Sequence, residues 1–306
     1  MRTDPLLRLG INTCFAVKRW QQPEQWAAIT AELGLNSVQL SLDLLPVTFD
    51  PADCLHYARR AAKAADAAGI DIHSAFTGLA AYASPLLLSD DADERRAAQG
   101  WYGVMIDVAA EAGATGMGGH IGALSVGSAA DRQRSAMLLD QQIEAMLELA
   151  ERARIAGLNH LQFENLAVTR EPGHSIEQAH QLEQALADSA VPWRLCLDVG
   201  HPPSLPAGTP SASAASWVAQ TWEHTPVVQL QQSPIGADHH GPFTAAANAA
   251  GAVDRDTILA GLADWDADEV PLFFEIIHAH EAPDELVLAD LRESVGYWRA
   301  GIGAHS

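Results

Sequence analysis

Residues 160–201 contain two short apolar segments, HLQFE at 160–164 and RLCLD at 194–198, with the segment SIEQAHQLEQALADS at 175–189 between them. Two strand-length apolar runs joined by a helical pattern predict a βαβ unit with parallel strands. The same alternation extends from this unit toward both ends of the chain. It predicts strands at 9–15, 37–42, 70–75, 115–120, 160–164, 194–198, 227–231 and 272–276.

Long segments rich in Ala, Leu, Glu, Gln and Arg follow these strands, and such residues favour helices. Several segments begin with Asp, Ser or Pro, which cap or preset a first helical turn. Four end on a glycine, which readily takes the left-handed conformation after a helix. The expected helices lie at 23–34, 51–69, 91–113, 131–157, 175–189, 211–224, 254–265 and 284–301, and the glycines are Gly34, Gly69, Gly113 and Gly157.

Eight strands, each followed by a helix, predict one (β/α)8 TIM-barrel domain over residues 1–306. The alternative is a doubly wound sheet, which normally carries a glycine-rich phosphate loop after its first strand. Here residues 13–19 read TCFAVKR and contain no glycine. The barrel is therefore the favoured architecture.

The composition of the chain excludes some classes of function. With 39 acidic and 18 basic residues the chain has a formal net charge of −21, which argues against nucleic acid as a partner. The three cysteines are scattered, as is usual for reduced thiols in the cytoplasm. We find no signal-peptide pattern and no apolar run of membrane-spanning length. These features predict a cytoplasmic protein that binds neither nucleic acid nor a membrane.

The last four expected strands each end on a polar residue that faces the barrel interior. Side chains alternate along a strand, so Leu161 and Phe163 would face the helices while Glu164 faces inward. The same reasoning in the following strands completes a set of four, Glu164, Asp198, Gln231 and Glu275. They would meet at the C-terminal mouth, where barrel enzymes build their active sites.

Three of these four residues are carboxylates, which would repel one another at close range. Protonation or a cation must relieve that repulsion, and a divalent metal ion is the simpler solution. For any one carboxylate alone, a helix cap or an ion pair with an arginine is an equally good explanation. Three carboxylates at matching strand ends favour a metal site.

The segments that carry these residues are FEN at 163–165, DVGH at 198–201, QLQQ at 229–232 and FFEII at 273–277. Together they resemble the xylose-isomerase-like barrel enzymes, in particular the sugar (phosphate) isomerases and epimerases that include ketose 3-epimerases of the tagatose-epimerase type. The resemblance covers roughly residues 9–300. GINTCFAVKRW at 10–20 and GADHHGPFT at 236–244 also resemble a subgroup acting on small ketose phosphates, such as erythrulose-phosphate epimerases or isomerases.

The resemblance implies that Glu164, Asp198, Gln231 and Glu275 are metal ligands. It also implies that Glu164 and Glu275 are the acid/base pair on opposite faces of the sugar. The family usually has a histidine where this chain has Gln231. The resulting all-oxygen ligand set favours Mn²⁺ or Mg²⁺ over Zn²⁺.

The resemblance further implies that His201 hydrogen-bonds a substrate oxygen and that Glu171 orients His201. A phosphate on the substrate would need a cationic or amide-rich pocket. The glycines before His120 suggest a close approach to a ligand. The family's arginine after the seventh strand is missing, and two histidines occupy that loop. The substrate-binding candidates are Lys18, Arg19, His120, Glu171, His201, His239 and His240, with Arg170 as a further cation. For Arg19 and Arg170, a surface or ion-pair role is the alternative.

The sequence thus predicts a metal-dependent epimerase or isomerase of a small ketose or ketose phosphate, acting through an enediolate. Three alternatives remain: a dehydratase or lyase on a polyol-derived ketone, a non-catalytic sugar-binding barrel, and a multi-zinc nuclease. The nuclease fits poorly, because it would need more histidines at the strand ends and a less acidic chain. Family analogy also suggests a dimer or tetramer.

Overall fold

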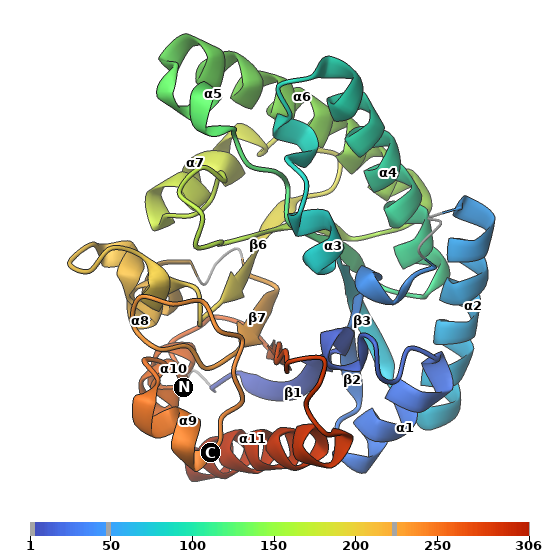
Figure 1. Ribbon diagram of the computed structural model, residues 1–306, viewed down its shortest axis with the longest axis vertical. Coiled ribbons are helices and arrows are strands. Elements are labelled where there is room, and N and C mark those ends of the chain that lie inside the picture. Colours follow the sequence, from blue (N-terminus) through green and yellow to red (C-terminus); the bar gives the residue numbers. More distant parts are fainter. Residues whose placement is uncertain (1–3, 47–49, 222–224, 306) are drawn as a thin grey trace.

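The computed structural model describes residues 4–46, 50–221 and 225–305. Its strands pair in parallel in chain order, and β1 also pairs with β8, so that the sheet closes into a barrel with helices around it (Figure 1). The strands are β1 Leu6–Asn12, β2 Ser37–Ser41, β3 Asp71–Phe76, β4 Gly116–Gly119, β5 His160–Glu164, β6 Trp193–Asp198, β7 Val227–Leu230 and β8 Glu269–Phe274. The predicted (β/α)8 barrel is confirmed.

Each predicted helix is present within a few residues of its expected bounds. The helices are α1 Pro23–Glu32, α2 Pro51–Ala68, α4 Ala92–Glu111, α6 Arg132–Ala156, α7 Ile176–Ala185, α8 Ala214–Thr221, α10 Arg255–Leu262 and α11 Asp284–His305. Residues 222–224 of the helix expected at 211–224 lie outside the described residues. All four glycines predicted at helix ends have left-handed φ values between 68° and 89°.

Shorter helices in the loops after the strands were not predicted. They are α3 Gly78–Tyr82, α5 Val126–Ala130 and α9 Ala245–Ala250, together with the 3-10 turns η1 Thr13–Ala16, η2 Leu42–Leu44, η3 Leu86–Leu88, η4 Pro202–Ser204 and η5 Pro210–Ala212. The first strand therefore ends three residues earlier than expected. The Asn12 side chain accepts a hydrogen bond from the Cys14 N–H at 2.9 Å and turns the chain into η1.

The strand side chains separate into two layers, as the alternation predicts. Those on the outer side join the main apolar core with the helices, and they include Leu161, Phe163, Leu195, Leu197, Val228, Leu230, Leu272 and Phe274. A separate cluster of Phe76, Cys196, Val227 and Phe273 fills part of the interior. Beside it, Gln39 accepts hydrogen bonds from Asn12 at 2.9 Å and Gln229 at 2.8 Å. The interior is thus a packed, hydrogen-bonded plug that supports the mouth.

Among the described helices, none combines the length and apolar character that crossing a lipid bilayer requires.

Candidate active site

Four polar side chains from consecutive strands come together at the mouth of the barrel. Glu164 ends β5, Asp198 ends β6, and Gln231 and Glu275 directly follow β7 and β8. All four are at most 3% exposed. Carboxylate oxygens of Glu164, Asp198 and Glu275 lie within 4.8 Å of one another, which is close enough to share one cation. The structure therefore brings the predicted carboxylates together.

Asn165 fixes the position of Asp198 from the neighbouring strand. Its side-chain oxygen accepts the Asp198 N–H at 2.7 Å, and its amide group donates to the Asp198 carbonyl at 3.0 Å. The N–H of Gly200 donates to Asp198 Oδ1 at 2.6 Å. The backbone and one carboxylate oxygen of Asp198 are thus held by protein groups. The sequence analysis named Asn165 only as part of the FEN segment.

Electrostatics make two of the carboxylates strong proton acceptors. Burial raises the pKa of Glu164 well above its usual range, and the charges of Glu275 and Asp198 add to the rise. Burial also raises the pKa of Glu275 to about 8, although His240 opposes the shift. Repulsion and desolvation therefore favour a proton or a cation between these groups.

Four buried atoms around the mouth have no hydrogen-bond partner among the described residues. They are His120 Nδ1, Glu164 Oε2, His240 Nδ1 and Glu275 Oε2. All four residues line one cavity, with free space of about 40 Å³, enough for a cation and ordered water. Buried polar atoms are rarely left unpartnered in folded proteins. Two carboxylate oxygens and two imidazole nitrogens are donors that suit a divalent cation, so the residues fit a metal site.

Gln231 does not offer its oxygen to this cavity, contrary to the predicted ligand role. Its Oε1 already accepts the Ser233 hydroxyl at 2.6 Å and the His240 N–H at 2.7 Å. Because a backbone N–H can only donate, this contact fixes the orientation of the amide. The Gln231 NH₂ group then faces the acids and donates to Asp198 Oδ2 and Asp238 Oδ1, both at 3.1 Å. Gln231 positions Asp198 and the following loop.

His201 lies at the mouth, as predicted. Its Nδ1 donates to the Asn165 carbonyl at 2.9 Å and is 3.5 Å from Glu164 Oε1. Its Nε2 lies 3.7 Å from Asp198 Oδ2 and 3.5 Å from Asp238 Oδ2. The ring therefore turns Nε2 toward the acidic cluster, where a ligand can reach it.

Glu171 does not orient His201, because the Asn165 carbonyl holds the His201 ring nitrogen. Glu171 instead accepts the N–H of Ile121 at 3.3 Å. Burial raises the pKa of Glu171 to about 8, and this backbone contact opposes the rise. Its carboxylate supports the loop after β4.

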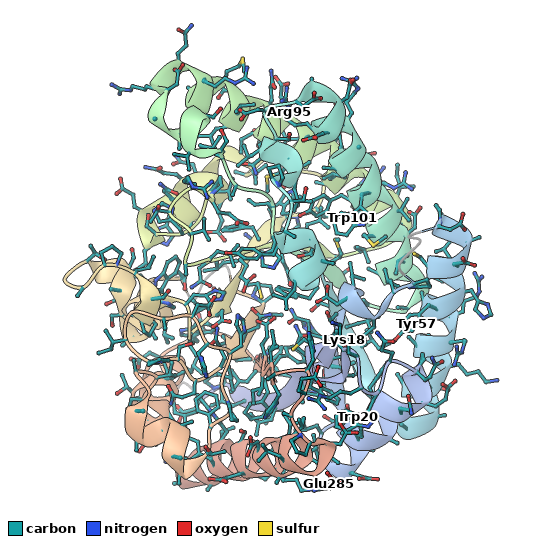
Figure 2. All side chains as sticks on the ribbon, in the orientation of Figure 1. Lys18, Trp20, Tyr57, Arg95, Trp101 and Glu285 are labelled. Atoms are coloured by element: carbon teal, nitrogen blue, oxygen red, sulfur yellow. The ribbon has the colours of Figure 1, made fainter. Side chains whose placement is uncertain are left out.

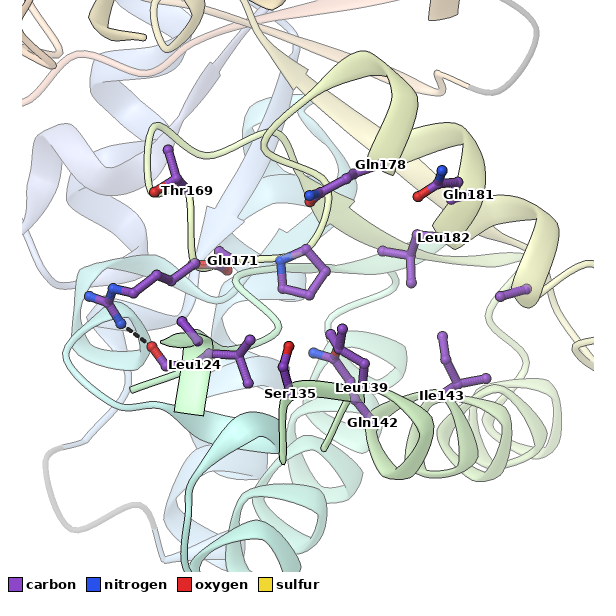
Figure 3. Close-up of a pocket in the computed structure, with 14 residues that line it drawn as sticks. Leu124, Ser135, Leu139, Gln142, Ile143, Thr169, Glu171, Gln178, Gln181 and Leu182 are labelled. Carbon is purple, nitrogen blue, oxygen red and sulfur yellow. Dashed lines mark hydrogen bonds between the residues drawn. The ribbon is translucent and has the colours of Figure 1, made fainter. Parts of the chain in front are cut away.

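Glu171 also borders a second cavity, of about 380 Å³, between α6 and α7 (Figure 3). This cavity lies outside the acidic cluster and shares none of its carboxylates. Arg170 also lines this cavity and donates to the carbonyl of Leu124. The Arg170 guanidinium therefore supports the loop after β4.

His120 lines the mouth cavity with a neutral ring. Burial, together with the charges of His201 and His240, lowers the pKa of His120 to about 3. Its Nδ1 lies 3.6 Å from Glu164 Oε2, and its ring packs against Tyr82 with centroids 4.9 Å apart. This arrangement makes His120 a neutral hydrogen-bonding group beside Glu164.

His240 and Asp238 reach the mouth from the loop after β7. His240 Nε2 is 3.4 Å from Asp238 Oδ1, and its Nδ1 is 4.0 Å from Glu275 Oε2. Burial lowers the pKa of His240, but the contact with Asp238 and the charges of Glu275 and Asp198 outweigh it and raise the pKa to about 10. The sequence analysis predicted His240 as a substrate contact and missed Asp238, whose only signal was its place beside two histidines.

Arg19 lies away from the cavity, contrary to its predicted contact with substrate. Its guanidinium donates to the carbonyls of Ala282 and Ala279 and to Asp284, each at 2.7 Å. Through these bonds, the Arg19 side chain holds the segment between β8 and α11 in place. The alternative interpretation, an ion-pair role, is the one that the structure supports.

Lys18, which is labelled in Figure 2, and His239 are both exposed, and neither lines the mouth cavity. Among the described residues around this cavity there is no lysine or arginine. The residue at the mouth whose raised pKa favours a positive charge is His240.

Asp43 is a further residue that the sequence analysis missed. Its carboxylate accepts the N–H groups of Leu79 and Ala80, both at 2.8 Å, and so docks α3 over the mouth. Tyr82 and Leu79 on α3 line the cavity. Asp43 follows β2 and belongs to none of the motifs in the sequence, and its contacts with α3 depend on how the loops fold.

The chain matches the family model described as xylose isomerase-like TIM barrel over residues 27–299. It therefore belongs to this family, as the resemblance in the sequence implied. Among curated proteins it is similar to a D-erythrulose 1-phosphate 3-epimerase from Brucella abortus (strain 2308). The two are 25% identical over 300 residues, which cover 95% of each protein.

Two solved structures illustrate the similarity. A protein from Rhodospirillum rubrum ATCC 11170, solved as a candidate xylose isomerase, is 29% identical with a TM-score of 0.90, over 96% of this chain and 99% of that chain. A D-psicose 3-epimerase from Clostridium cellulolyticum H10, solved with D-tagatose, is 12% identical with a TM-score of 0.71, over the same shares of the two chains. The second similarity shows the shared fold.

Proposed function

We propose that this protein is an epimerase or isomerase that acts on a small ketose or ketose phosphate and depends on a divalent metal ion. One observation carries the proposal: the unpartnered oxygens of Glu164 and Glu275 face one buried cavity. The name of the Brucella relative supports a four-carbon ketose phosphate and a change at C3.

The chemistry is a proton transfer beside a carbonyl. One glutamate removes the proton from the carbon next to the carbonyl, and the electron pair left behind forms an enediolate. In epimerisation the other glutamate returns a proton to the opposite face of the same carbon. In aldose–ketose isomerisation the proton goes to the neighbouring carbon. In the metal-free protein, burial raises the pKa of both Glu164 and Glu275, so both carboxylates accept protons readily.

Glu164, Asp198 and Glu275 would hold the metal ion. A bound divalent ion would polarise the substrate carbonyl and stabilise the negative charge that develops on its oxygen. Three carboxylates favour Mn²⁺ or Mg²⁺. His120 and His201 would contact substrate oxygens, because both rings line the same cavity.

A ketose is larger than the free space at the mouth, so the covering segments must move outward to admit it. Helix α3 is the best candidate, since Leu79 and Tyr82 are 47% and 44% exposed and line the cavity from outside. A phosphate group would have to be recognised by histidines and backbone N–H groups, because the described lining contains no lysine or arginine.

The test is incubation of Mn²⁺-loaded protein with tetruloses, pentuloses and their phosphates in D₂O, followed by NMR of the products. We expect deuterium at a single carbon of one substrate, together with a stereoisomer or an aldose. Loss of water or an unsaturated product would establish the lyase instead. Binding of a sugar without exchange would establish the non-catalytic barrel.

A matched control is Glu183→Gln. Glu183 is also a largely buried carboxyl group, and burial raises its pKa to about 7, although Arg194 opposes the rise. Arg194 is at the start of β6, so Glu183 lies near the opposite end of the barrel from the mouth. Glu183→Gln should retain exchange, whereas Glu164→Gln and Glu275→Gln should not.

A further inference from the structure

The cation site proposed above contains three carboxylates but no oxygen from Gln231, because that oxygen is already bonded. We propose that His240, from the loop after β7, supplies the nitrogen ligand, that Asp238 orients its ring, and that Gln231 holds its backbone in place. This inference rests on the metal-dependent function proposed above.

The position of His240 Nδ1 is the first argument. This atom is buried and unpartnered, and it lies 4.0 Å from Glu275 Oε2, which is also unpartnered. That separation is too long for a hydrogen bond. Two ligands each about 2.1 Å from one ion can be up to about 4.2 Å apart, so a single ion can bridge these two atoms. His240 also forms a group with His201 and Asp198 whose ligand atoms lie within 4.8 Å of one another, and this group shares Asp198 with the three carboxylates.

The other ring nitrogen supplies the second argument. Nε2 of His240 faces Asp238 Oδ1 at 3.4 Å. A proton on Nε2 directed at this carboxylate leaves the lone pair of Nδ1 free to point toward Glu275. Histidine ligands of metal ions commonly have a carboxylate on their second nitrogen in this way, which fixes the tautomer and the ring orientation.

The loop itself is built to present this ring. An antiparallel bridge closes it, in which Gln232 and Gly241 exchange hydrogen bonds of 2.8 and 2.9 Å. Gln231 Oε1 accepts the His240 N–H at 2.7 Å, and the His240 carbonyl accepts the N–H of Ile277 at 2.9 Å. His240 has a backbone φ of +48°, a value that residues other than glycine rarely adopt. Contacts on both sides of its backbone thus hold a strained residue in one orientation.

Two alternatives to metal binding by His240 can be tested. His201 is the other nearby imidazole, but its Nδ1 is bonded to Asn165 and only its Nε2 is available. The second competitor is the imidazolium of His240 itself, which would neutralise the carboxylates without a metal ion. Each competitor predicts a different result from the same measurement.

The experiment uses the full chain, freed of metal with a chelator and then titrated with Mn²⁺. Free Mn²⁺ measured by EPR gives the affinity, and pulsed EPR detects a directly bound nitrogen. We expect nitrogen coupling in the wild type. In His240→Gln we expect the coupling to disappear and the affinity to fall about tenfold or more. His239→Gln is the matched control, since His239 is exposed beside it, and should keep both.

Nitrogen coupling that persists in His240→Gln, or that disappears in His201→Gln instead, overturns the proposal. A wild type that binds Mn²⁺ without nitrogen coupling, or does not bind it, also overturns it and favours the imidazolium. If His240→Gln does not fold, Asp238→Asn decides the question: it should keep the coupling and lose about tenfold in affinity. Unchanged affinity in Asp238→Asn would contradict the role of Asp238 and with it the proposal.

A different experimental result would contradict the proposed function. If the Mn²⁺-loaded wild type exchanges no deuterium with any sugar of the panel, the epimerase is ruled out. The nitrogen coupling would still show whether His240 is a ligand.

Discussion

The two halves of the barrel mouth use polar residues differently. After β1 to β4, the polar side chains bond to backbone: Thr13 Oγ1 accepts the Ser41 N–H at 2.8 Å, and Thr77 Oγ1 accepts the His120 N–H at 2.9 Å. After β5 and β8, Glu164 and Glu275 keep oxygens without partners. The first half mainly shapes the loops and leaves one mouth atom, His120 Nδ1, without a partner among the described residues, whereas the second half holds the unpartnered carboxylate oxygens that a cation can bind.

The largest expected effect is on the acid/base pair. Glu164→Gln or Glu275→Gln should reduce kcat by about 10²–10⁴-fold or more, because each removes a group that we propose moves a proton. Thermal stability should be retained or rise, since each change removes a buried acid that burial disfavours in its charged form. Substantial turnover in either variant, measured with the substrate identified above, would show that the unpartnered oxygens are not catalytic.

Next in size is Asp198→Asn. The loss of one negative charge from the cluster should weaken Mn²⁺ binding by about 100-fold, while Asn165 still holds the backbone at this position. Titration monitored by EPR measures the change. Binding as tight as in the wild type would place the cation elsewhere.

The melting temperature of the metal-free protein should depend on pH through Glu275 and His240, which both belong to the second half of the mouth. The pKa of Glu275 is raised to about 8 and that of His240 to about 10 in the folded protein. A raised folded pKa contributes stability that is complete below the unfolded pKa and is lost as pH rises through the folded value. Both groups therefore predict a falling melting temperature between about pH 6.5 and 8. Calorimetry should show a shallower slope in Glu275→Gln, and an equal slope would contradict this origin.

The smallest effect on metal binding is expected for a substitution in the first half of the mouth, after β1 to β4. Thr77→Val should cost about 1–3 kcal/mol of unfolding free energy, because it leaves the buried His120 N–H without its acceptor. Urea unfolding measures this loss. Mn²⁺ affinity should remain within about twofold of the wild type. A large loss of metal binding would mean that the two halves are coupled.

The periodicity of the sequence was sufficient to predict the strands and the faces of their side chains. Glu164, Asp198 and Glu275 follow from strict alternation and from strand ends that must meet in a barrel. The role of His240 could not be predicted in this way. Its placement depends on a bridge between Gln232 and Gly241 and on a bond from Ile277, and such pairings leave no periodic trace.

For the glycines of β4, the prediction from the sequence was correct only in part. The sequence analysis took Gly118 and Gly119 as signs of close approach to a ligand. The structure shows close approach to the protein itself: a Cβ at Gly118 would lie 2.0 Å from the Gln162 carbonyl oxygen, and one at Gly119 would lie 2.5 Å from Thr77 Oγ1. The steric requirement was predicted correctly, but the neighbour was a strand and a loop of the barrel.

The bonds from Arg19 to Ala279 and Ala282 join the beginning of the chain to its final segment, beside the pairing of β1 with β8. During synthesis, the chain through Ala282 must therefore leave the ribosome before this seam can close. Glu275 follows β8 in this later segment, so a nascent chain holds Glu164 without its proposed partner until β8 has been made. The mouth can consequently form only after both β1 and β8 have been synthesised.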